Sequence, residues 1–165
     1  MKVLLPVLVF IVGCTAMAKA QKTTTLANPK ISNGIKLTLS KGIELKAAYL
    51  FYDDGKKMTD SNIAALNQNV NMMIQINRGG WIEKEEKVSI GASEKILTNT
   101  GLTILDEADL FATLTDISAD DAQYITLKAV ITSMTKKYSF FLVRFTIWDK
   151  WGTGKITGSY RLKIR

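Results

Sequence analysis

The chain has 165 residues, 47% of them hydrophobic and 22% charged, a balance typical of a globular protein that buries a core without disulfides. It has no histidine and a single cysteine, Cys14, which excludes a histidine-based triad, a histidine-ligated zinc and a disulfide framework from the folded domain. The net charge of +7 is spread along the chain without a run of five basic residues, which indicates solvated surface charge and argues against nucleic-acid binding.

The first twenty residues are typical of a secretory signal peptide. Lys2 precedes an apolar run from Val3 to about Val12, which is too short for a typical membrane span, and small residues follow it. Ala18-Lys19-Ala20 forms a small-x-small site that predicts cleavage before Gln21. We therefore expect an exported protein, located in the periplasm, on the cell surface or in the medium.

A second interpretation of this segment involves Cys14. The stretch Ile11-Val12-Gly13-Cys14 resembles the lipobox of bacterial lipoprotein signals. The resemblance implies that Cys14 is diacylated and becomes the first mature residue, so that the protein contacts the membrane through a lipid anchor. The alternative is that Cys14 is one more apolar residue of the signal core, as cysteine often is.

Residues 21–33 form a threonine-rich, polar stretch that contains Pro29. This composition predicts a flexible N-terminal arm, and we expect a single folded domain over 34–165.

From residue 34 onward, apolar and polar residues alternate with a period of two, which is typical of strands with one buried face. In 70–77, for example, the alternation predicts Val70, Met72, Ile74 and Ile76 on the inner face. The same rule places Tyr49 and Phe51 inward in 43–52. Further segments of this kind are 35–39, 125–131, 141–147 and 156–164, with shorter candidates at 88–90 and 102–105.

Turn-forming residues separate these segments, and no long amphipathic helix lies between them. The pattern predicts an all-β fold: an antiparallel two-sheet sandwich, immunoglobulin-like or similar, with seven to eight strands and one or two short helical turns. The helical candidates are 60–66 and 106–124. In the second of these, Ser118 followed by Asp121 resembles a capping box.

The stretch Gly152-Thr153-Gly154-Lys155 has the composition of a phosphate-binding loop. A phosphate loop, however, needs a serine or threonine after its lysine and a helix after that, so that helix N-terminal amides face the anion. Here Ile156 follows the lysine and an alternating strand follows Ile156. The sequence therefore predicts a turn between two strands.

Three tryptophans border glycine-containing loops, and together with Asp149 they are the predicted ligand-binding residues: Trp81, Trp148 and Trp151. The alternative is that these indoles fold back and plug the ends of the sandwich. Asp53, Asp54 and Asp149 lie in predicted loops and are candidates for calcium ligands, although no contiguous calcium-binding loop is present. We otherwise expect no cofactor, since aspartate is also a common turn residue.

These observations predict an exported, non-enzymatic protein of the bacterial envelope that binds a protein or a glycan through loops at one end of the sandwich. One alternative is an assembly subunit that pairs through 156–165 as an exposed edge strand. Another is a small carboxylate-dependent hydrolase, which would need two carboxyl groups facing each other across a cleft.

Overall fold

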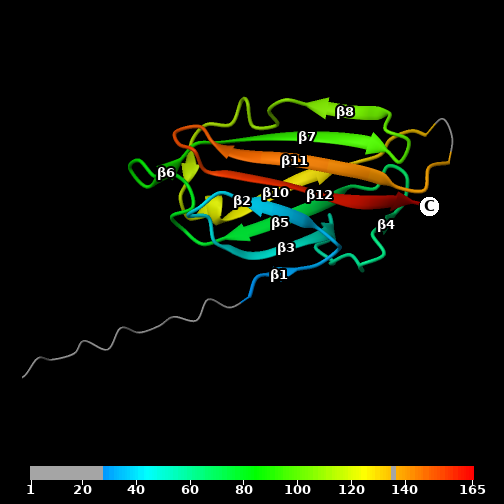
Figure 1. Cartoon of the computed structure of the whole chain (residues 1–165), viewed down its shortest axis with the longest axis horizontal. Helices are drawn as coiled ribbons and strands as arrows, with labels where there is room; N and C mark the ends of the chain where they lie inside the picture. Colours follow the sequence, from blue (N-terminus) through cyan, green and yellow to red (C-terminus); the bar gives the residue numbers. More distant parts are fainter. Residues whose placement is uncertain (1–27, 135–136) are drawn as a thin grey trace, which may run out of the picture.

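The computed structural model describes residues 28–134 and 137–165, which form two β-sheets stacked against each other (Figure 1). The first, sheet A, has four strands in the order β1-β3-β5-β10. Their bounds are β1 Lys30–Ile31, β3 Leu45–Tyr52, β5 Val70–Ile76 and β10 Tyr124–Ala129.

Sheet B has the order β2-β12-β11-β7-β8, and β4 pairs with the end of β12. A third pairing joins β6 to β9, and a single 3-10 turn, η1, follows β9. The bounds are β2 Lys36–Leu39, β4 Ile63–Ala64, β6 Lys87–Val88, β7 Ile90–Thr98, β8 Thr103–Glu107, β9 Ile117–Ser118, η1 Asp121–Gln123, β11 Phe141–Asp149 and β12 Lys155–Ile164.

The predicted fold class, an all-β antiparallel sandwich, is confirmed. Within the described residues, the strand pairings are antiparallel except for β1 with β3 and β4 with β12. The core lies between the sheets and is built from the inward positions that the alternation predicts in β5, β10, β11 and β12. Val70, Met72, Ile74 and Ile76, for example, are all buried.

The C-terminal strand is not an edge, which corrects the assembly alternative. β12 pairs with β11 along one side and with β2 along the other, and β4 pairs with Lys163 and Ile164 near its end. Its backbone donors and acceptors are therefore largely used within the molecule, so 156–165 does not offer an open edge to a second copy.

The predicted orientation of β3 is wrong beyond Lys46. The pairing of β3 with β5 shifts by one residue between Leu45 and Ala47, because Lys46 is the extra residue of a β-bulge. The shift exchanges the two faces of the strand, so Ala48 and Leu50 are fully buried. Tyr49 and Phe51, which strict alternation places in the core, lie half-buried on the outer face.

The strand β7 was not predicted beyond its first residue. Its core-facing positions include Ala92 and Glu94, and small residues precede the glutamate, so the apolar alternation is interrupted. β7 is extended because it pairs with a neighbouring strand and not because of its own sequence pattern. Nine successive residues of β7 pair with Phe141–Asp149 of β11.

The folded domain begins before residue 34. β1 pairs in parallel with β3, and Asn33 is buried at the centre of a hydrogen-bond network. Its side chain donates to the carbonyl of Thr59 and to Asn62 Oδ1, both at 3.0 Å, and its Oδ1 accepts from the main chain of Leu50 at 2.8 Å. Residues 30–33, which the sequence assigns to a flexible arm, are therefore part of the folded domain.

One of the two predicted helical segments is extended instead. Residues 60–66 contain the short strand β4 rather than a helix. In 106–124 the expected turn is present as η1: Ser118 Oγ accepts the main-chain N–H of Asp121 at 3.0 Å and donates to its carboxylate at 2.7 Å.

Candidate ligand-binding face

Trp81 plugs the end of the sandwich. It is buried within the core, and its indole Nε1 donates to the carbonyl of Ala122 at 3.4 Å. A β-carbon on Gly154 would lie 3.1 Å from its ring, so the β11–β12 turn packs closely over the indole. The plugging alternative therefore describes this residue.

Asp149 holds the β11–β12 turn. It is buried, and its carboxylate accepts the main-chain N–H of Ile82 at 2.6 Å and that of Trp151 at 2.8 Å. A β-carbon on Gly152 would lie 2.7 Å from Asp149 Oδ2, so a glycine fits this position best. The glycine-rich stretch at 152–155 is therefore a turn, as predicted. The carboxylate of Asp149 is hydrogen-bonded to main-chain N–H groups within the protein.

Trp151 lies half-buried in this turn, and the ammonium of Lys84 sits 4.6 Å from its ring centroid. The contact is a cation–π interaction between the β5–β6 loop and the β11–β12 turn. Trp151 is thus at the end of the sandwich, as the sequence predicts, but one face of its indole is already covered.

Trp148 has a different position, on the outer face of sheet B. Its neighbour Ile147 is fully buried, so Trp148 points away from the core and is half-buried. The indole lies across Gly91, its partner on β7, where a β-carbon would overlap the ring. Beside it is a hollow of about 250 Å³ lined by Thr146, Lys155 and the turn 152–154.

A row of hydroxyl side chains crosses this outer face next to Trp148. Thr38, Thr157, Thr146 and Ser93 are directly paired across the adjacent strands β2, β12, β11 and β7. Directly paired residues share a face, so the four hydroxyls lie in one line. We call these four residues the hydroxyl row. None of the four side-chain hydroxyl groups hydrogen-bonds to another described residue. Sequence reasoning missed the row because it requires the register between strands.

Asp53 and Asp54 are not near Asp149. They follow the end of β3, which pairs with the start of β5, whereas Asp149 ends β11 at the opposite end of the sandwich (Figure 1). The pKa of Asp53 is lowered because Asn69 and Asn71 donate to its carboxylate, at 2.6 and 2.7 Å. Across 28–134 and 137–165, no three acidic residues lie close enough together to hold a metal ion. Asp53, Asp54 and Asp149 therefore do not come together as the calcium site that the sequence suggested.

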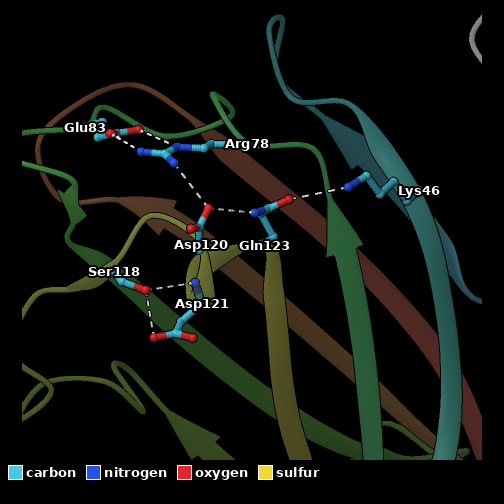
Figure 2. A network of polar contacts seen from close by, with 7 residues as sticks. All are labelled: Lys46, Arg78, Glu83, Ser118, Asp120, Asp121 and Gln123. Atoms are coloured by element: carbon cyan, nitrogen blue, oxygen red, sulfur yellow. Dashed lines mark hydrogen bonds and ion pairs between the residues drawn. The ribbon is translucent and has the colours of Figure 1, made fainter.

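The other acidic side chains at the Trp81 end form a polar network (Figure 2). Arg78 donates to both oxygens of Glu83 and, at 3.3 Å, to Asp120, which also accepts from Gln123. The hydrogen bonds from Arg78 hold the pKa of Glu83 below its usual range. The network connects the β5–β6 loop to η1 and holds the two segments together.

Cys14 and the predicted signal segment 1–20 lie outside the described residues. Within 28–134 and 137–165, no helix has the length and apolar character needed to cross a membrane.

No family model and no curated protein sequence matches the chain. Among solved structures, the chain is similar to the C-terminal domain of wzt, with 14% identity over 84% of this chain and 82% of that one, at a TM-score of 0.48. It is also similar to the soluble domain of PmoD from Methylocystis sp. ATCC 49242 (Rockwell), with 11% identity over 81% of this chain and 100% of that one, at a TM-score of 0.39.

Proposed function

We propose that this chain is an exported, non-enzymatic binding module of the bacterial envelope, and that it holds a glycan on the outer face of sheet B. The predicted signal peptide at 1–20 supports export. The observation that carries the glycan assignment is the position of Trp148 beside the hydroxyl row on a regular sheet surface.

The chemistry of this surface suits a sugar. A pyranose ring presents a face of C–H groups, which stacks on an indole, and a rim of hydroxyls, which exchange hydrogen bonds with side-chain hydroxyls. Trp148 supplies the stacking surface. Thr146 and Thr157, on the next cross-strand row, supply the side-chain hydroxyls. The strands hold all three side chains in fixed register, so little order has to be imposed when a ligand binds.

The residues of this face favour binding over catalysis. Residues 34–165 contain no histidine or cysteine, and a glycosidase needs two opposed carboxyl groups. Of the described carboxylates at the outer face of sheet B, Asp106 pairs with Lys95 at 2.6 Å, and Asp60 accepts the main-chain N–H of Asn33 at 2.7 Å. Both carboxylates are thus engaged by other groups of the protein.

A protein partner at the end loops is the second candidate. Ile82 is 48% exposed beside the β11–β12 turn, and Leu110 and Leu114 are exposed on the loop that follows β8. That loop lies at the same end, since Lys150 Nζ donates to the carbonyl of Phe111 at 3.0 Å. Exposed aliphatic side chains beside Trp151 are suited to a protein contact.

Two tryptophan variants separate the candidates. We expect Trp148→Ala to weaken binding to a soluble polysaccharide about tenfold, the loss of one stacking contact, while Trp151→Ala leaves it within about twofold. Affinity electrophoresis against a polysaccharide panel measures both, with urea unfolding to show that each variant is folded. Loss of binding in Trp151→Ala alone would place the glycan site at the end loops, and the absence of binding to any polysaccharide would rule out the glycan proposal and leave the protein partner as the candidate.

A further inference from the structure

A row of basic side chains lies parallel to the hydroxyl row. It is formed by residues that pair directly across four adjacent strands: Lys36 on β2, Ser159 on β12, Arg144 on β11 and Lys95 on β7. Because directly paired residues share a face, the three cations lie on the outer face of sheet B. Arg144 and Lys95 are immediate cross-strand neighbours, but Lys95 is neutralised by Asp106 at 2.6 Å, so the cations of this row without an ion pair to a described residue are Lys36 and Arg144.

The face is hollowed at this row. A depression of about 590 Å³ is lined by Lys36, Arg144, Arg161 and Lys163, together with Ser159 and the loop residues 60–62. Arg161 is held in place because its guanidinium stacks on Phe140, with 4.5 Å between the guanidinium carbon and the ring centroid. The hollow therefore has at least one cation whose position is fixed before a ligand arrives.

These four cations are not neutralised by neighbouring acids. The ion pairs among the described residues involve Arg78, Lys95 and Lys150, and none involves a cation of the hollow. The one carboxylate that lines it, Asp60, already accepts the main-chain N–H of Asn33 at 2.7 Å. A concave surface with four unpaired cations and one acid attracts anions.

We propose that this hollow binds the anionic groups of an acidic polysaccharide, so that the glycan of the proposed function carries negative charge. The inference rests on that proposed function, because the sugar that stacks on Trp148 and the acidic group that binds in the hollow belong to one glycan on one face. Along β11, Trp148, Thr146 and Arg144 alternate outward, so Trp148 and Arg144 are separated by roughly 14 Å. A short run of sugars stacked on Trp148 spans this length, passes the hydroxyl row and brings an acidic group to Arg144.

A polysaccharide fits this face better than a membrane surface does. The outward positions between the basic row and Trp148 are hydroxyls, which hydrogen-bond to sugars. Of the aliphatic side chains beside the cations, Leu97 and Leu142 are half-buried, and Ile63, which pairs with Lys163, is 40% exposed. A membrane-binding surface inserts a broad apolar face beside its cations, and one exposed isoleucine does not form such a face.

The test compares ligands that differ only in charge. Polygalacturonate and its fully methyl-esterified form share a backbone, as do dextran sulfate and dextran. We expect the full domain to bind the charged member of a pair at least tenfold more tightly, and this preference to shrink as salt screens the exposed cations. Equal affinity for both members would overturn this inference while leaving the glycan proposal intact, and binding to neither would overturn both.

Matched double variants locate the charge. Lys36→Ala/Arg144→Ala and Lys41→Ala/Lys56→Ala lower the net charge equally, but only the first pair lies in the hollow. We expect the first to weaken binding to the acidic polysaccharide by roughly tenfold and the second to leave it nearly unchanged. Equal losses would mean that overall charge, and not the hollow, attracts the ligand. Binding to phosphatidylglycerol vesicles in place of the acidic polysaccharides would identify the face as a membrane surface and overturn the proposal.

Discussion

The most unusual single residue is Glu94, a carboxylic acid inside the apolar core. It is 2% exposed, lies on the inner face of β7, and neither carboxylate oxygen hydrogen-bonds to a described residue. Burial alone raises the pKa of Glu94 to about 7. Tyr160 is also fully buried nearby, and its pKa is raised by burial and by the charge of Glu94.

The pKa of Glu94 predicts a pH-dependent stability. In the unfolded chain the carboxyl ionises near its ordinary pKa of 4.5, whereas in the folded protein it stays protonated to about 7. Between these values the folded state binds more protons, so its free energy of unfolding falls as pH rises and stays low above pH 7. The loss is on the order of 3 kcal/mol.

Urea unfolding at pH 5 and pH 8 measures this effect. We expect Glu94→Gln to be more stable than the wild type at pH 8, with a smaller difference at pH 5. Glu85→Gln is the control, because Glu85 is an exposed glutamate in the loop before β6 and does not pair with Glu94. If the wild type and Glu94→Gln lose stability in parallel between the two pH values, Glu94 ionises freely in the folded state.

At the scale of elements, sequence periodicity predicted the strands whose cores are uniformly apolar. β5, β10 and β11 follow it, because their apolar residues at every second position are buried, and β12 follows it apart from Gly158. β3 departs from it at the Lys46 bulge, which no local pattern reveals. β7 departs because Glu94 stands at an inward position.

The candidate face was predicted only in part, for a related reason. Trp148 was identified from its place at the end of a strand beside a glycine turn. The hydroxyl row and the basic row combine residues from four strands, and only the register between strands brings them into line. Asp149 was also predicted as a ligand contact, and a sequence does not reveal that its carboxylate accepts two main-chain N–H groups.

The pairing of β7 with β11 makes a testable link between Gly91 and Trp148. Since a β-carbon on Gly91 would overlap the indole, we expect Gly91→Ala to displace Trp148 and weaken glycan binding about as much as Trp148→Ala does. The crowding should also lower the free energy of unfolding by roughly 1–2 kcal/mol. Tryptophan fluorescence, urea unfolding and affinity electrophoresis record the three effects.

A double-variant cycle isolates this contact. In a Trp148→Ala background, Gly91→Ala should have little effect on stability, because the side chain that it displaces is gone. An equal loss of stability in both backgrounds would show that Gly91 is needed for another reason, and the indole would not be held by that contact.

For the whole molecule, the two sheets present chemically different outer surfaces. The outer face of sheet A carries Tyr49 and Phe51, 6.0 Å apart between ring centroids, and the exposed Tyr124. The outer face of sheet B carries Trp148, the hydroxyl row and the basic hollow. The net charge of +7, which looks dispersed along the sequence, is thus partly gathered on one side by folding.

The central claim is that a glycan binds to the outer face of sheet B, and NMR titration of the isotope-labelled domain with an acidic oligosaccharide tests it most directly. We expect the largest chemical-shift changes at the Trp148 indole, along β11 from Arg144 to Trp148 and along β12 from Lys155 to Ser159. Shifts confined to Tyr49, Phe51 and Tyr124 on sheet A, or to the loops at the Trp151 end, would contradict it.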